Sequence, residues 1–499
     1  MARSLLFPRS SRALFLLGPL VAGVTLGCGS SSNPGGPVTG PIPGESTQVT
    51  VLVSSAANDR LVQFGTQLET LTLTDKQGKT TTLLSTPQEV EFMHLNGSAE
   101  PLLTVSVPQD VYTSATATAG YASFTCATEQ SGGADISTYA YGAVPDNQVT
   151  VQLPEPLTVD GSAMVLSLEL LVSPSATFPS NCYDQGASYS INPTFNLAAM
   201  TLSSQPTSVT NGKLTALEGL VASAGSAPGT FTVTAADTAV VIGGVQPPVA
   251  TWNVSTSSST VFQGVGNTDG LTVGMPVDLD GALQPDGSVL ATRVAVPDPD
   301  PTDLTVNSGP LREIASSVPL LNLVAQEEEG PVQYYLIGWP EYNDSSTAFA
   351  IWGGLANMAS LPFPASFTAA NMVAGQMVLI TTHATAVENY PTLVPATTTT
   401  LMPQTIDGTV QGVGAAGGFT TYTVQLAPYD FFPTFAVQGG QTTLLKNPQE
   451  VVVYADSNAQ INTTATPGAG SLLRFSGVIF NDNGTLRMDC FAVADGVTE

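Results

Sequence analysis

Histidine is the side chain that most readily serves acid–base, nucleophilic or zinc chemistry near neutral pH, and this 499-residue chain has two, His94 and His383. A Ser-His-Asp triad or a zinc site would need at least one of them beside suitable partners. The sequence contains no His-x-x-x-His, Gly-x-Ser-x-Gly or Cys-x-x-Cys spacing that would supply such partners. We therefore interpret both histidines as structural or surface residues, and we expect no catalytic residue, no metal site and no cofactor.

Carboxylates are the second set of candidates, because two of them suffice for glycoside hydrolysis. With 39 Asp and Glu residues some pair must lie close together, and no spacing singles one out. The acidic segments 298–303 and 482–484 offer oxygen donors for calcium, but neither ends in the bidentate Glu of an EF-hand loop. We interpret the first segment as part of a linker and the second as a hairpin turn. The run 327–329, three glutamates, is interpreted as an exposed turn.

The first residues of the chain carry a targeting pattern. Three arginines precede an apolar run over 13–26, and Gly27 and Cys28 follow it. A positive start, a short apolar run and a small residue before the cleavage point are typical of a secretory signal, and the run is short for a membrane span. The Gly27-Cys28 ending resembles the bacterial lipobox. This resemblance implies removal of residues 1–27 and lipidation of Cys28; the alternative is a plain secretory signal that happens to precede a cysteine.

Residues 28–47 are rich in Gly, Pro and Ser and have no apolar periodicity, which predicts a flexible tether. In lipoproteins of well-studied envelopes, an Asp after the lipidated cysteine retains the protein at the inner membrane, and here that residue is Gly29. The resemblance therefore implies a lipid anchor in the outer membrane, with the protein on its periplasmic or its surface-exposed face. Removal of three arginines and no acids would change the formal charge to (12 − 3) − 39 = −30.

Charge excludes nucleic acid as a partner. The whole chain has a formal net charge of −27 and a pI of about 4.1. Residues 213–499 alone contain 6 Lys and Arg against 24 Asp and Glu, hence −18. Nucleic-acid binding depends on a basic surface that meets the phosphates, so repulsion rules against it.

Cysteine usage fits an oxidising compartment outside the cytoplasm. Cys126 and Cys182 fall in one predicted domain, which predicts a Cys126–Cys182 disulfide; two independent buried thiols are the alternative. Cys490 lies in an apolar, strand-like run and is interpreted as a small core residue.

Almost all of the chain after the signal shows apolar residues that alternate with a period of two, as in Val49, Val51 and Val53. Gly, Pro, Asp and Asn interrupt the pattern at regular intervals, as turns do. The sequence predicts an all-β fold: a β-sandwich over 48–204, followed by about three small OB-like β-barrel repeats.

The predicted sandwich resembles an uncharacterised bacterial family, the domain of unknown function "forty-three eighty-two". The residues that carry the resemblance are Gln48-Val49-Thr50-Val51, Leu71-Thr72-Leu73-Thr74-Asp75, Pro108-Gln109-Asp110-Val111 and Asn192-Pro193-Thr194-Phe195. None of them forms a catalytic motif, so the resemblance implies a domain type and no chemistry.

A repeat organises the C-terminal half. The stretch Leu217-Glu218-Gly219 is echoed by Ile406-Asp407-Gly408, and segment 274–283 aligns with 470–479. Hairpin turns follow at Asp286-Gly287 and Asn483-Gly484, where we expect type I′ geometry. A weaker middle copy is recognised by Gly375-Gln376-Met377-Val378. The pattern predicts barrels over 213–297, 308–402 (degenerate) and 404–499, with the last able to fold alone and with a stiff, Pro-rich spacer at 297–301.

The first copy also resembles a family, the domain of unknown function "fifty-six sixty-six". The resemblance rests on Gly274-Met275-Pro276-Val277 and on the run Asp286-Gly287-Ser288-Val289-Leu290. It implies a small barrel and no known activity.

The leading hypothesis from the sequence is a non-enzymatic, lipid-anchored cell-envelope protein that acts in surface binding or envelope organisation. Its expected partners are the membrane, through the lipid anchor, and a polysaccharide or an envelope protein. The alternative is a carbohydrate-binding or carbohydrate-processing surface protein. Aromatic residues of the middle copy could form its sugar platform, although core packing is their commoner fate: Tyr334, Tyr335, Trp339, Tyr342 and Trp352.

Overall fold

Strands and the short connections between them make up nearly all of the structure, a computed structural model. It describes residues 40–497 except 57–59, 128–136, 145–146, 178–188, 237–249, 315–319, 325, 330–340, 356, 384–393, 428–429 and 439–444. The predicted lipidation residue Cys28, the signal and most of the tether lie outside the described residues. So do Cys182, Tyr334, Tyr335 and Trp339.

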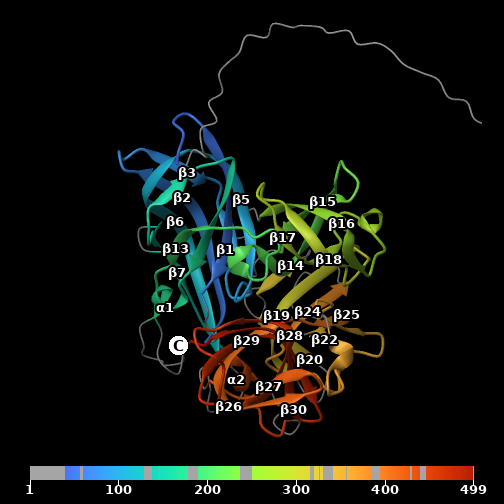
Figure 1. Cartoon of the computed structure of the whole chain (residues 1–499). Coiled ribbons are helices and arrows are strands. Elements are labelled where there is room, and N and C mark those ends of the chain that lie inside the picture. Colours follow the sequence, from blue (N-terminus) through green and yellow to red (C-terminus); the bar gives the residue numbers. More distant parts are fainter. Residues whose placement is uncertain are drawn as a thin grey trace, which may run out of the picture. The chain divides into compact units, whose positions relative to one another are not determined.

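The N-terminal strands, in blue to green in Figure 1, form one hydrogen-bonded sheet of 11 strands. They are β1 (Ser46–Ser55), β2 (Leu61–Asp75), β3 (Thr80–Leu84), β4 (Gln88–Glu91), β5 (Ala99–Pro108), β6 (Asp110–Ala127), β7 (Ser137–Ala143), β8 (Gln148–Gln152), β9 (Leu157–Val159), β10 (Ala163–Leu170) and β13 (Thr194–Met200). In the described residues the path runs β3-β2-β6-β8-β13-β10-β1-β5, and β8 pairs with both β6 and β13. The one-turn helix α1 (Val172–Ser175) and the small pair β11 (Ala176–Thr177) and β12 (Ser190–Ile191) lie beside it.

Strand β1 is buried on both faces over most of its length. It pairs with β10 in parallel and with β5 in antiparallel, so its backbone is satisfied on both edges. Val49, Val51 and Val53 belong to the core of the N-terminal strands, whereas Leu52 packs with the first barrel. Because both faces are covered, the alternation in burial that a solvent-facing sheet would show is lost.

The first and third copies are closed five-stranded barrels of the same order. The first consists of β14 (Lys213–Ala224), β15 (Thr230–Ala235), β16 (Thr251–Gln263), β17 (Pro276–Leu283) and β18 (Val289–Ala295). The third consists of β26 (Gln404–Ala416), β27 (Phe419–Leu426), β28 (Glu450–Asn462), β29 (Leu472–Asp482) and β30 (Thr485–Asp495), with helix α2 (Phe431–Gln438) between β27 and β28. In each, the third strand pairs in parallel with the fifth. Figure 1 shows the third copy, in orange and red, curling into a ring.

The middle copy has a different pairing. Its strands are β19 (Leu304–Ile314), β20 (Leu320–Leu323), β21 (Glu327–Glu329), β22 (Glu341–Tyr342), β23 (Ala348–Ile351), β24 (Met377–His383) and β25 (Val394–Leu401). Among the described residues they form a seven-stranded sheet of order β20-β22-β25-β24-β19-β21 with β23 beside β25. The glutamates at 327–329 are therefore a strand paired with β19, and our interpretation of them as an exposed turn is wrong.

The two predicted hairpin turns are present but differ in type. Asn483 and Gly484 both have positive φ, 50° and 86°, as a type I′ turn requires. In the first copy only Gly287 does, at 84°, and Gly287 N donates to Gln284 O at 2.9 Å. This hairpin therefore turns through Pro285 and Asp286 in ordinary conformations and uses the glycine to rejoin the strand. The expected type I′ geometry holds for the third copy and is wrong for the first.

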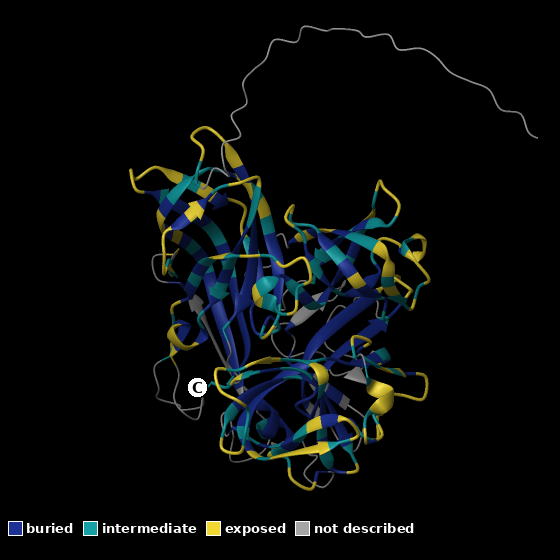
Figure 2. Cartoon of the chain, viewed as in Figure 1, coloured by how far each residue is buried: buried dark blue, intermediate teal, exposed yellow. Residues whose placement is uncertain are grey.

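Most buried residues lie in the strands, and many exposed residues lie in the connections between them (Figure 2). Residues 40–499 form one compact unit, in which the cores of neighbouring copies are shared. Phe419, Tyr454 and Phe480 of the third barrel pack in the cluster of the middle copy. Among the described residues, no helix is long and apolar enough to cross a membrane.

Candidate functional site

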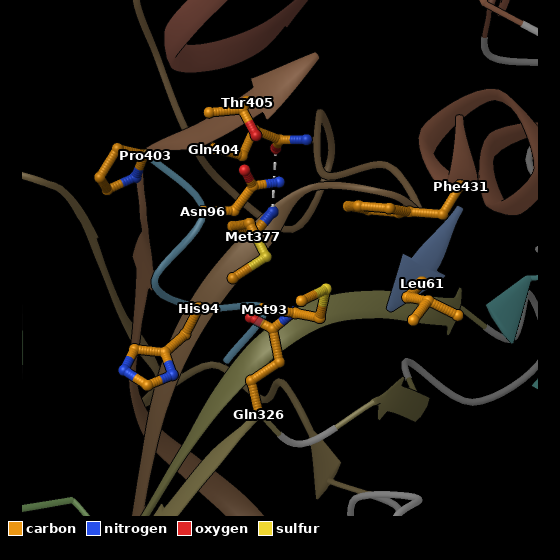
Figure 3. A pocket seen from close by; sticks show the side chains of 10 residues that line it. All are labelled: Leu61, Met93, His94, Asn96, Gln326, Met377, Pro403, Gln404, Thr405 and Phe431. Atoms are coloured by element: carbon orange, nitrogen blue, oxygen red, sulfur yellow. Dashed lines mark hydrogen bonds between the residues drawn. The ribbon is translucent and has the colours of Figure 1, made fainter. Parts of the chain in front are cut away.

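Two small adjoining cavities lie where the sandwich meets the middle and third copies. One, of about 50 Å³, is drawn in Figure 3 and lined by Leu61, Met93, His94, Asn96, Gln326, Met377, Pro403, Gln404, Thr405 and Phe431. The other, of about 60 Å³, shares His94, Asn96 and the segment 403–405. Drug-sized ligands occupy cavities of roughly 300–1,000 Å³, so neither cavity is large enough for such a ligand.

His94 is held in this site by a fully buried carboxylate. Its Nδ1 lies 3.1 Å from Glu91 Oε2, and its backbone N–H donates to the same oxygen at 2.9 Å. Glu91 Oε1 accepts two further backbone N–H groups, from Phe64 at 2.8 Å and Met93 at 3.0 Å. On the other side of the ring, Nε2 lies 3.6 Å from Glu100 Oε2. The imidazole thus lies between two acids. No sequence motif marks this arrangement, because Glu91, His94 and Glu100 come from β4, the turn after it and β5.

Gln404 closes the cavity from the third copy. Its Oε1 accepts the N–H of Met377 at 3.0 Å, the dashed line in Figure 3, and its Nε2 donates to Gly375 O at 3.2 Å. The side chain therefore ties the start of β26 to the start of β24. Both polar atoms of the Gln404 amide therefore bond to the main chain. The side chain holds the backbone in place and has little capacity left to bind a ligand.

His383 also has a carboxylate partner. Its Nε2 lies 3.0 Å from Asp298 Oδ2, and its Nδ1 lies 2.7 Å from Thr302 O. Burial opposes a charge on the ring, but the Thr302 carbonyl and Asp298 outweigh it and raise the pKa of His383. Asp298 is only 3% exposed and also accepts the Thr381 hydroxyl at 3.1 Å. Within the predicted spacer at 297–301, Asp298 is thus a buried residue that contacts strand β24.

A third charged cluster joins the first and middle copies. Arg293 donates to Asp278 at 2.7 Å and to Asp280, and its guanidinium lies 5.2 Å from the ring centroid of Trp352. Burial disfavours the charge, but the two aspartates outweigh it and raise the pKa of Arg293 further. Trp352 is 4% exposed, so it packs in the core and offers no sugar platform.

The described cysteines are both buried. Cys126 lies in β6 at the centre of the sandwich core. Its predicted partner Cys182 lies outside the described residues, so the bridge stays a prediction. Cys490 is buried in β30 as expected, and burial raises the pKa of its thiol to about 12, which makes it a core residue with little thiolate.

A family model, "Domain of unknown function (DUF5666)", matches residues 218–295. The match covers 78 of the 499 residues and coincides with the first barrel, as the resemblance implied. No curated protein and no solved structure matches the chain.

Proposed function

We propose that the chain is a non-enzymatic, lipid-anchored cell-envelope protein of the outer membrane that offers a fixed β-platform for surface binding or envelope organisation. The lipobox resemblance at Gly27-Cys28 and the resemblance of residues 48–204 to the family "forty-three eighty-two" support the envelope part. Buried hydrogen bonds between the β-modules support the platform part.

The observation that carries the platform is a set of buried side chains that donate to the main chain of another module. Trp252 Nε1 in the first barrel donates to Pro101 O of the sandwich at 2.6 Å. Gln326 Nε2 in the middle copy donates to Val62 O at 2.6 Å, and Gln376 Nε2 donates to Ile479 O of the third barrel at 2.8 Å. Each module is therefore linked to a neighbouring module by a buried hydrogen bond.

The strength of these ties comes from burial. A hydrogen bond contributes a net 0.5–1.5 kcal/mol or so, but a buried donor left without its acceptor costs about 1–3 kcal/mol. Gln376 is fully buried and Trp252 is nearly so. Sliding or hinging between modules would break these bonds and expose the shared apolar clusters, so the modules are expected to move as one body.

The proposed anchor supplies the attachment. Strand β1 begins at Ser46, so 17 residues separate it from Cys28. A Gly- and Pro-rich chain of this length spans on the order of 20–25 Å as a flexible coil. The proposed arrangement is a rigid acidic body held close to the membrane on a short, flexible tether.

Replacement of the anchoring cysteine tests the proposal. In cells that express the full chain and are fed an alkyne-tagged fatty acid, the wild type should be labelled and sediment with membranes. Cys28→Ser should lose both properties, and Cys490→Ala, which removes a buried cysteine elsewhere, should keep both. A Cys28→Ser variant that is still labelled and membrane-bound would refute the anchor.

The carbohydrate alternative loses one of its supports, because Trp352 is covered by Arg293 and by Phe491, whose ring centroid lies 5.7 Å away. The other aromatic candidates of the middle copy give no support for a sugar platform. Tyr342 lies in β22, and three lie outside the described residues: Tyr334, Tyr335 and Trp339. A sugar site, if the protein has one, must rest on other residues.

A further inference from the structure

A third cavity, of about 170 Å³, lies between the first barrel, the loop after β23 and the third barrel. Its polar lining consists of Lys213 from β14, Asn357 from the loop, Asp456, Asn458 and Gln460 from β28, and Asp489 from β30. Leu355 and Ala459 add apolar surface.

Asp489 is the unusual member of this lining. It is 7% exposed, and no described residue donates a hydrogen bond to its carboxylate. Burial, with the nearby charge of Asp456, raises the pKa of Asp489 to about 6. A carboxylate that is largely buried and receives no donor from the described residues has acceptor oxygens available to a ligand in the cavity.

The repeat shows that the barrel itself does not need this acid. Gly281 pairs with Ala291 in the first copy and Gly477 pairs with Cys490 in the third, so Asp489 occupies the position of Leu290. The first copy thus closes the same barrel with an apolar residue at this place.

Asp456 is likewise specific to the third copy. Strand β28 bulges between Ala455 and Gln460, where β16 bulges between Thr256 and Val261, and Asp456 stands where the first copy has Ser257. Its carboxylate is fixed by the Asn458 backbone N–H at 2.8 Å, by the Asn458 side-chain amide at 3.2 Å and by the Asn357 amide. The third copy thus has two acids at one rim where the first copy has Ser257 and Leu290; Asp456 is held by hydrogen bonds and Asp489 receives none from the described residues.

Lys213 brings a donor to the same cavity. Its Nζ lies 5.6 Å from the Phe491 ring centroid, and no described carboxylate lies within ion-pair distance of it. Burial lowers the pKa of this ammonium, and Asp280 opposes that effect. The cavity is thus lined by the Lys213 ammonium and by the carboxylates of Asp456 and Asp489, which form no ion pair with it.

The charges decide which ligand fits. An anion such as phosphate would be repelled by two carboxylates. A metal ion is disfavoured by the Lys213 ammonium, and the described residues contain no cluster of three or more His, Cys, Asp and Glu that could hold one. A neutral ligand with several hydroxyl groups can donate to the carboxylates and accept from the ammonium and the amides.

We propose that this cavity is a carbohydrate subsite that receives one neutral sugar ring of a glycan, with Asp489 accepting its hydroxyl groups and Lys213 donating to it. The volume suits a single ring and is too small for a longer oligosaccharide. This deepens the proposed binding role and rests on it for access to envelope glycans, whereas binding itself is independent of the anchor.

The test uses the purified full chain in a detergent without a sugar headgroup. Methyl glucoside, methyl galactoside, methyl mannoside and N-acetylglucosamine are titrated by saturation-transfer NMR, together with calcium chloride and sodium phosphate. At least one sugar should bind with millimolar affinity, more weakly below pH 6, where Asp489 loses its charge. Lys213, Asp456 and Cys490 are the other titratable groups that line the same cavity.

Two variants separate a binding role from a structural one. Asp489→Leu, the residue of the first copy, should weaken binding at least tenfold while raising the melting temperature, because a buried unpartnered acid is removed. Asp489→Asn, which keeps the size, should weaken binding and abolish the pH dependence. The control Asp495→Asn, on the exposed end of the same strand, should change neither.

Several results would overturn the subsite. They are no binding of any sugar to the wild type, binding unchanged within twofold in Asp489→Leu, a lower melting temperature of that variant, or a response to calcium or phosphate alone. None of these results bears on labelling of Cys28, so the anchor and the subsite fail separately.

Discussion

The buried side chain of Glu91 accepts several backbone hydrogen bonds. It is 0% exposed and accepts backbone N–H groups from Phe64, Met93 and His94. Glu91→Ala should leave these donors buried without acceptors and reduce the free energy of unfolding of the sandwich by about 3 kcal/mol or more. Denaturant unfolding measures the effect, and Glu155→Ala, at an exposed site, should change it by about 0.5 kcal/mol or less. Equal small effects in both variants would contradict this role of Glu91.

His383 predicts a pH dependence. Because its pKa is raised in the folded chain, its contribution to stability is complete below the unfolded value of about 6.5 and is lost as the pH rises through the folded value. His383→Gln should therefore lower the melting temperature more at pH 6 than at pH 8. An equal decrease at the two pH values would show that the ring does not gain a proton on folding.

Sequence patterns could not reveal these residue-scale partners. His383 and Asp298 are 85 residues apart, and Glu91, His94 and Glu100 meet only because β4, the turn after it and β5 fold against one another. The structural role expected for the histidines agrees with their buried carboxylate contacts. Motif spacing did not point to these partners, because spacing along the chain says nothing about pairs formed between strands.

At the scale of elements, a crowded glycine marks each barrel. A Cβ on Gly408 of β26 would lie 2.5 Å from Gln425 O, and one on Gly219 of β14 would lie 2.3 Å from Thr234 O. Gly408→Ala should therefore cost about 1–3 kcal/mol by overpacking. Gly412→Ala in the same strand meets no atom within 4 Å and should be close to neutral. Denaturant unfolding compares them, and similar stabilities would refute the crowding argument.

The elements were largely predictable because alternation, turn residues and the Gly-containing repeats are local signals. The aligned glycines correctly mark the first strands of two closed barrels of equal strand order. The errors occur where pairing over a distance decides the outcome. Glutamates 327–329 become strand β21 because β19 offers an edge, and Asp286-Gly287 adopts a turn other than type I′ although its sequence favours one.

At the scale of the molecule, the third barrel is closed by its hydrogen bonds but shares its apolar surface. Tyr454, Val478 and Phe480 pack in the cluster of the middle copy. Residues 404–499 expressed alone should be β-rich by circular dichroism, as the sequence predicts, but should melt at a lower temperature than the same barrel in the full chain. The same melting temperature in both would show that the shared surface contributes nothing.

Composition and the alternation of apolar residues predicted an acidic, all-β chain, but they could not predict how closely the modules are connected. The modules are connected by the side chains of Trp252, Gln326 and Gln376, which belong to no sequence motif. Their role is evident only from the backbone carbonyls to which they donate. The sequence pattern suggested a string of modules, whereas residues 40–499 form one compact unit. The envelope location, by contrast, rests on the sequence of the first 28 residues and stays a prediction.

The most direct test of the central claim is the mass of the amino-terminal peptide of the full-length protein extracted from membranes. The proposal predicts a peptide that begins at Cys28 and carries the added mass of a diacylglyceryl group, usually with a further acyl chain on the amine. A peptide that begins elsewhere, or one that begins at an unmodified Cys28, would contradict the lipid-anchored envelope protein described here.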